Sequence, residues 1–131
     1  MKISIITVTL NSEESIESCL RSVVEQTHPN VEHIVIDGQS TDRTLPILAS
    51  HQDQIDVITS EKDNGIYDAL NKGFDLASGD IVGLLHSDDE FHNSEVLLEV
   101  ERKFLQDSPD FVYGDIEMVD SAQKVCRQWR T

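Results

Sequence analysis

Short runs of β-branched and aliphatic residues alternate along the chain with segments whose apolar residues recur every three or four positions. The short runs predict strands, and the first covers residues 3–8, with the sequence ISIITV. The other predicted strands are residues 33–36, 55–59, 81–85, 111–113, 116–119 and 124–129. Strands that alternate with helical segments are typical of a parallel sheet with crossover helices. We therefore expect an α/β fold in which residues 81–85 form a central strand.

The segments with helical spacing predict four helices, each with one apolar face. The residues expected on these faces are Ile16, Leu20, Val23 and Val24, then Leu45, Leu48 and Ala49, then Ile66, Ala69, Leu70, Phe74 and Ala77, and finally Val96, Leu97, Val100, Phe104 and Leu105. The expected N-caps are Asn11 or Ser12, Thr41 or Asp42, and Asn93 or Ser94. Pro46 fits only in the first turn of its helix. No repeat divides the chain, so we expect one domain over residues 1–131.

The charge of the chain excludes some partners. It carries 25 Asp+Glu against 10 Lys+Arg, a formal net charge of −15. Nucleic acids are excluded as partners because phosphate binding requires clustered basic residues. A basic patch for anionic lipid is equally absent, although the whole protein could still associate peripherally with a membrane. The hydrophobic share of 38% lies in regular blocks and can form a core, so the charge does not indicate disorder.

Cysteine usage and the start of the chain bear on location. Cys19 and Cys126 lie far apart, without the spacing of a metal or redox motif, which favours a reducing environment. The first residues do not form the long apolar core of a signal peptide, and no apolar run is long enough to span a membrane. We expect a cytoplasmic protein, with the inner face of the membrane as the alternative location.

Polar residues follow each of the first four predicted strands. These segments are Thr9-Leu10-Asn11, Asp37-Gly38-Gln39-Ser40, Glu61-Lys62-Asp63 and His86-Ser87-Asp88-Asp89. Ligands of open parallel sheets bind beyond the carboxyl ends of the strands. Carboxylates gathered at that edge repel one another unless a cation or hydrogen-bond donors offset the charge. The pattern predicts a shared ligand site, and the alternative is a set of ordinary turn and cap residues.

Asp88 and Asp89 are the strongest candidates for metal ligands. They follow an apolar strand directly, and adjacent carboxylates offer the hard oxygen ligands that Mg²⁺ or Mn²⁺ prefers. Such a metal could hold the phosphates of a substrate. The alternative is an acidic loop ahead of the next helix. No glycine-rich phosphate loop is present, so phosphate binding would depend on metal more than on a glycine cradle. Asp37 could accept hydrogen bonds from a base or a ribose, or pair with local backbone.

Two runs resemble family 2 glycosyltransferases, which are inverting enzymes with the GT-A fold. Residues 3–44 resemble the opening of that family, with the sequence ISIITVTLNSEESIESCLRSVVEQTHPNVEHIVIDGQSTDRT. Residues 62–91 resemble its next two blocks, with the sequence KDNGIYDALNKGFDLASGDIVGLLHSDDEF. The stretch DNGIYDALNKG is most similar to members that build capsule and exopolysaccharide repeats. The resemblance implies a Rossmann-like, mostly parallel sheet with helices on both faces.

The resemblance also implies a function. It implies a nucleotide-sugar donor (a UDP-sugar is favoured), a divalent Mg²⁺ or Mn²⁺, and transfer with inversion to a polysaccharide or lipid-linked acceptor. The implied donor-binding residues are Thr9, Asn11, Glu13, Asp37, Ser40, Asp68, Lys72, Ser87 and Asp88. The implied metal ligands are Asp88 and Asp89. The chain departs from the family at His86, in place of the first DxD carboxylate, and at Gly38, in place of the second acid of the VDDGS block.

The resemblance supplies no general base within this chain. In the family that base is an acid well downstream of the matched blocks, so we expect a truncated domain without the acceptor and base region. One alternative is a donor-binding fragment that catalyses nothing. A second is an acidic phospho-receiver domain, but that would need an acidic pair after the first strand, where this chain has Thr9-Leu10-Asn11.

Overall fold

The computed structural model describes residues 1–120, 122 and 124–129. The chain divides into two units, Met1–Leu98 and Glu99–Thr131. The expectation of one domain over the whole chain stays a prediction. In the described part of the chain, no helix combines the length and apolar character needed to cross a membrane.

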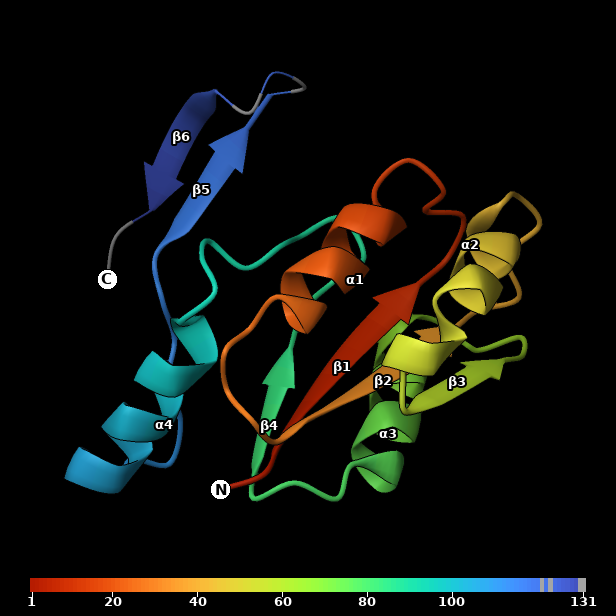
Figure 1. Cartoon of the computed structure of the whole chain (residues 1–131). Coiled ribbons are helices and arrows are strands. Elements are labelled where there is room, and N and C mark those ends of the chain that lie inside the picture. Colours follow the sequence, from red (N-terminus) through yellow and green to blue (C-terminus); the bar gives the residue numbers. More distant parts are fainter. Residues whose placement is uncertain (121, 123, 130–131) are drawn as a thin grey trace. The chain divides into compact units, whose positions relative to one another are not determined.

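The first unit is built on four parallel strands (Figure 1). They are β1 (Ile3–Thr9), β2 (Val31–Asp37), β3 (Val57–Ser60) and β4 (Ile81–Leu84), in the order β3-β2-β1-β4. The α/β prediction with a parallel sheet is therefore confirmed. Ile55, expected in the third strand, lies in the connection between a short 3₁₀ turn (Gln52–Gln54) and β3.

The prediction that residues 81–85 form a central strand is wrong for the described residues. β4 pairs only with β1, so it lies at the edge of this sheet. Val82 and Leu84 are 40% and 48% exposed. An apolar run predicts that a strand can be buried, but it does not predict the position of the strand in the sheet. That position depends on the crossover connections between strands.

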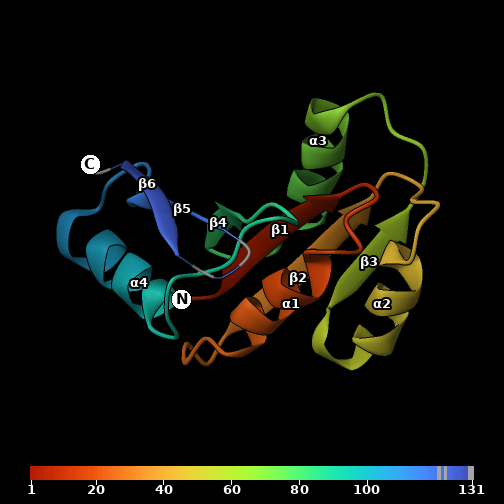
Figure 2. The ribbon, with the colours of Figure 1, turned by 90° about the horizontal axis from the view of Figure 1, so that it is seen from above.

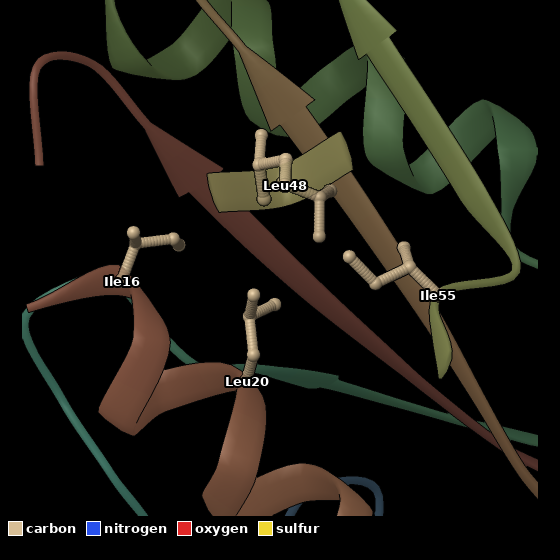
Figure 3. Close-up of a cluster of buried hydrophobic side chains, with 5 residues drawn as sticks. Ile16, Leu20, Leu48 and Ile55 are labelled. Atoms are coloured by element: carbon tan, nitrogen blue, oxygen red, sulfur yellow. The ribbon is translucent and has the colours of Figure 1, made fainter. Parts of the chain in front are cut away.

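Helices cover both faces of the sheet, as predicted. α1 (Ile16–Val24) and α2 (Thr44–Ser50) pack on one face, and α3 (Ile66–Leu76) packs on the other (Figure 2). On the first face, Ile16, Leu20, Val35, Leu48 and Ile55 form one buried cluster (Figure 3). Burying such side chains contributes roughly 1.5–3 kcal/mol each relative to leaving them in water.

A second cluster lies between the sheet and α3. Its buried members are Ile6, Ile34, Ile36 and Ala69. Gly73 allows the close approach of α3, because a Cβ atom there would lie 2.5 Å from Cγ2 of Ile6. Ile6 and Val35 thus face opposite sides of the sheet, as the alternation of strand side chains requires.

Not every residue expected on a helix's apolar face is buried. Val24, Ile66, Phe74 and Leu105 are exposed, as is Ala49. Spacing identifies a helical face correctly but does not set its width.

The predicted helix starts are only partly right. α1 begins at Ile16, with Ser15 as its N-cap residue, so Asn11 and Ser12 do not cap it. The carbonyl of Ser12 instead accepts hydrogen bonds from the N–H groups of Ser15 and Ile16, which form a turn ahead of the helix. The N-cap residue of α2 is Arg43, although Asp42 Oδ1 accepts a hydrogen bond from Thr44 N–H at 2.9 Å. Pro46 lies in the first turn of α2, as predicted.

The second unit contains most of α4 (Val96–Asp107) and an antiparallel hairpin. The hairpin pairs β5 (Ile116–Val119) with β6 (Val125–Trp129), with a register shift between Met118 and Val119. The strand predicted over residues 111–113 is wrong, because these residues pair with no described strand. Instead, the rings of Phe111 and Tyr113 stack with centroids 5.9 Å apart.

Candidate functional site

The loops after β1 and β2 are fastened together at the carboxyl edge of the sheet. Asn11 has a φ of 49°, a left-handed conformation that Asn adopts more readily than most residues. Its N–H donates to Ser40 Oγ at 2.8 Å, and its Oδ1 accepts from Thr41 N–H at 2.8 Å and from Asp42 N–H at 3.3 Å. The side chain expected to cap a helix therefore joins two loops.

Further hydrogen bonds reinforce this junction. Glu13 N–H donates to Asp42 Oδ2 at 3.2 Å, and Arg43 N–H donates to Glu13 Oε2 at 3.0 Å. Ser12 N–H donates to Thr44 Oγ1 at 2.8 Å. Glu13, predicted to bind the donor, thus helps to shape the loop that lies beside it.

Asp37, at the end of β2, is fully buried. Its carboxylate accepts hydrogen bonds from Gln39 N–H and Ser40 N–H, both at 2.9 Å, from Ser60 Oγ at 2.8 Å, and from Ser40 Oγ. These bonds hold Gln39 at a φ of 71°, a strained conformation for a residue with a side chain. Asp37 therefore organises the loop, and its contact with a nucleotide stays a prediction.

The carboxylate of Asp63 covers Gly38. A Cβ atom on Gly38 would lie 2.9 Å from Asp63 Oδ2, so a side chain fits there only if Asp63 moves. Asp63 Oδ1 accepts a hydrogen bond from Gly65 N–H at 3.2 Å. The sequence predicts Asp63 among the polar residues at this edge of the sheet but not its contact with Gly38, because that contact forms only when the loop after β3 is placed in space.

Asp68 and Lys72 belong to an ion-pair group on α3. Lys72 Nζ lies 3.1 Å from Glu61 Oε1 and 3.6 Å from Asp68 Oδ2. The hydrogen bond with Glu61 raises the pKa of Lys72. Asp68 Oδ2 also accepts from Asn64 N–H at 2.9 Å. Their roles in donor binding stay predictions.

A cavity of about 650 Å³ opens at this edge of the sheet. Its size falls in the range of small-molecule sites. It is lined by Val8, Asn11, Ser12, Glu13, Glu14, Ser15, Asp42, Ile66, His86, Ser87 and Asp88. Four predicted donor-binding residues line it, namely Asn11, Glu13, Ser87 and Asp88.

The other predicted site residues do not line the cavity. They are Thr9, Asp37, Ser40, Asp68, Lys72 and Asp89. Thr9 is buried, and no described residue forms a hydrogen bond with its Oγ1. Ser12, which the sequence reasoning missed, bridges two loops through a 2.8 Å hydrogen bond between its Oγ and that of Ser87.

Residues 86–89, which we call the acidic turn, carry the predicted metal ligands. Asp89 N–H donates to the carbonyl of His86 at 3.0 Å, which closes the turn. Desolvation and the nearby Asp88 carboxylate raise the pKa of Asp89, while His86 opposes that effect. The two carboxylates therefore interact, and a cation between them would relieve their repulsion.

The donor set of the acidic turn would fit a small divalent metal for which the protein supplies only some of the ligands. Within the described ranges, no three His, Cys, Asp or Glu side chains form a group that could hold a metal ion alone. Mg²⁺ commonly uses one or two protein carboxylates and takes its other ligands from substrate phosphates and water. Asp88 and Asp89 can supply that share, and Asp88 lines the cavity.

Comparison with known proteins identifies the family. The model of glycosyl transferase family 2 matches residues 4–129. The PGL/p-HBAD biosynthesis glycosyltransferase of Mycobacterium tuberculosis is 38% identical over 119 residues, covering 88% of this chain and 46% of the relative. The chain belongs to glycosyl transferase family 2. It spans less than half the length of the curated relatives it matches.

Two solved structures share the fold of this chain. TarS 1-349 of S. aureus in complex with UDP-GlcNAc has a TM-score of 0.77 and 30% identity, covering 84% of this chain and 33% of TarS. The mannosyltransferase PcManGT from Pyrobaculum calidifontis in complex with GDP-Man and Mn²⁺ has a TM-score of 0.73 and 25% identity, covering 90% and 35%. The prediction of a GT-A glycosyltransferase fold is confirmed.

Proposed function

We propose that this family 2 chain binds a nucleotide-sugar, with a UDP-sugar favoured, in the cavity at the carboxyl edge of the sheet. The observation that carries the proposal is that Asp88 of the acidic turn lines the same cavity as the fastened loop of Asn11 and Ser12. Support comes from TarS, whose structure contains UDP-GlcNAc, and from PcManGT, whose structure contains GDP-Man and Mn²⁺.

In this proposal, Asp88 and Asp89 hold a divalent Mg²⁺ or Mn²⁺. When bound, the cation would neutralise the charge that develops on the leaving nucleotide diphosphate. The cavity also exposes Glu13, Glu14 and Asp42. An anionic donor would be repelled by these carboxylates in the absence of a cation, so the acidity of the cavity favours metal-dependent binding.

The neutral groups of the cavity would orient the donor. Ser12, Ser87 and Asn11 line the cavity, where the hydroxyl oxygens can accept hydrogen bonds and the side-chain NH₂ of Asn11 can donate them. Asn11 and Ser12 belong to the loop fastened to its neighbour, and Ser87 is bound to Ser12. Such preorganised groups lower the entropy cost of binding.

The complete reaction would transfer the sugar with inversion to a saccharide or lipid-linked acceptor. The resemblance to capsule and exopolysaccharide enzymes supports that acceptor class. We place the general base outside residues 1–131, as the resemblance implies. A cytoplasmic location, with peripheral association at the inner face of the membrane, belongs to the same proposal.

Calorimetric titration of the chain with UDP-, GDP- and dTDP-sugars, with and without Mn²⁺ or Mg²⁺, tests the proposal. We expect a UDP-sugar to bind only in the presence of metal. The Asp88→Asn/Asp89→Asn double variant should bind it at least about 100-fold more weakly. Failure of every donor to bind in a metal-dependent way would overturn the proposal. Binding without sugar transfer would limit the role of this chain to donor binding.

A further inference from the structure

A row of polar side chains on α1 contacts the segment that carries the acidic turn. We call Cys19, Ser22 and Gln26 the polar stripe; the first two lie on α1 and the third lies just beyond its end. Cys19 Sγ donates to the carbonyl of His86 at 3.5 Å, and Ser22 Oγ accepts from Phe91 N–H at 3.2 Å. These two contacts lie on either side of Asp88 and Asp89 in the sequence.

Gln26 extends the same contact farther along the chain. Its Nε2 donates to the carbonyl of Asn93 at 2.6 Å, and its Oε1 accepts from Leu97 N–H at 3.0 Å. Thr27 N–H donates to the carbonyl of Ser94 at 2.8 Å. The segment after β4 is therefore fastened along its length to α1 and its C-terminal extension, rather than lying as a free loop.

Cys19 is oriented by a chain of buried polar groups. Nε2 of His33 lies 2.8 Å from Thr7 Oγ1, which lies 3.8 Å from Cys19 Sγ. No described residue forms a hydrogen bond with Nδ1 of His33, and burial lowers the pKa of His33 to about 4, so the ring is neutral at pH 7. A buried N–H without a partner is costlier than a buried lone pair, which favours the proton on Nε2. His33 then donates to Thr7, and Thr7 donates to Cys19.

This order leaves the S–H of Cys19 directed at the acidic turn. Burial raises the pKa of the Cys19 thiol to about 12, and the nearby Asp89 and Asp88 add to the shift. The thiol therefore keeps its proton at neutral pH. Its hydrogen can point to only one acceptor, and the Thr7 hydroxyl already donates to its sulfur, so the His86 carbonyl is that acceptor.

We propose that Cys19 and Ser22 are positioning residues, which hold the acidic turn from both sides so that Asp88 and Asp89 present their carboxylates together. Cys19 acts on His86, whose carbonyl also accepts the hydrogen bond that closes the turn. Ser22 donates to the carbonyl of Cys19 at 2.8 Å and accepts from Phe91, so it links the two contacts. The advantage for metal binding rests on the proposed function, whereas the fastening of the turn does not.

Amide hydrogen exchange of the metal-free chain, measured by NMR, tests the fastening. We expect Cys19→Ala to speed exchange of the Asp89 amide about fivefold, and Ser22→Ala to do the same for the Phe91 amide, as the loss of one hydrogen bond predicts. Cys19→Ser keeps a donor and should lie closer to wild type. Val23→Ala is the matched control, since Val23 is buried on the same helix and has no contact with the turn among the hydrogen bonds described.

Mn²⁺ affinity in the presence of UDP, followed by electron paramagnetic resonance, tests the consequence. We expect about fivefold weaker Mn²⁺ binding in Cys19→Ala and Ser22→Ala, with Val23→Ala unchanged and Cys19→Ser partly restored. Equal exchange at Asp89 and Phe91 in all variants, or an equal change in Val23→Ala, would overturn the positioning role. If the wild-type chain binds no Mn²⁺, the proposed function fails, and the exchange measurement still decides the positioning role.

Discussion

The carboxylates at the two ends of β2 accept several hydrogen bonds from the protein, whereas those of the acidic turn do not. Glu32, near the start of β2, accepts hydrogen bonds from Ser4 Oγ, from Ser78 N–H at 3.0 Å and from Ser78 Oγ at 2.9 Å. Asp37, at its end, accepts four. Donors of the protein therefore satisfy both β2 carboxylates, which makes them part of the fold.

The acidic turn lacks such donors. Lys2 Nζ lies 3.4 Å from Glu32, whereas no hydrogen bond or ion pair among the described residues reaches the carboxylates of Asp88 and Asp89. Although burial raises the pKa of Glu32, the hydrogen bonds from Ser4 and Ser78 outweigh it and hold that pKa at about 2. The pKa of Asp89 moves the other way. Counting carboxylates at the edge of the sheet is therefore a weaker guide to function than asking which of them already accept hydrogen bonds from the protein.

Asp37→Asn should produce the largest loss of stability. The NH₂ group of the asparagine would face N–H and hydroxyl groups that now donate to the carboxylate, and these buried donors would lose their acceptor. We expect a loss of about 3 kcal/mol in the free energy of unfolding. Urea denaturation measures this loss. Ser60→Ala, which removes only one of the four bonds, is the control and should cost about 1 kcal/mol. Equal stability of wild type and Asp37→Asn would break the distinction between the two regions.

Glu32→Gln should have an intermediate effect of about 1 kcal/mol at pH 7, because it weakens hydrogen bonds that the charged form accepts. The pKa of Glu32 is lowered on folding from 4.5 to about 2. Its stabilising effect is therefore complete above pH 4.5 and is lost as the pH falls from there toward 2. Thermal unfolding from pH 2 to 7 should show the two proteins converging at low pH, and a constant difference would contradict the assignment.

Asp89→Asn should change the stability least, and it should increase the stability rather than reduce it. A raised pKa means that folding favours the protonated acid, so any stability from this group is present below about pH 3.8 and is lost as the pH rises through the folded-state pKa. In chelator at pH 7, we expect the variant to be more stable by about 0.3 kcal/mol, since solvent screens charges at the surface. Urea denaturation in parallel with Glu32→Gln tests the sign, and a destabilised Asp89→Asn would show that the turn relies on this charge.

Much of the fold could be predicted from the sequence because the signals are local. Residues 3–8 and 33–36 include most of the buried residues of β1 and β2, and the spacing of Ile16 and Leu20 predicts the buried face of α1. The edge position of β4 could not be predicted, since strand pairing joins residues far apart in the chain. For the same reason the cap predicted at Asn11 is wrong, because the partners of its side chain are 30 and 31 residues away.

The sequence by itself determined the family, the α/β class and the gathering of polar residues at the carboxyl edge of the sheet, because periodicity and short motifs are properties of neighbouring residues. Only the tertiary structure decided which carboxylates are satisfied. In the folded chain Asp37 accepts four hydrogen bonds and the Asp63 carboxylate lies next to Gly38. The acidic turn contacts α1 through the hydrogen bond between Cys19 and His86. A carboxylate's partners come from distant segments, and only the packing of the sheet and helices brings those segments within hydrogen-bond distance.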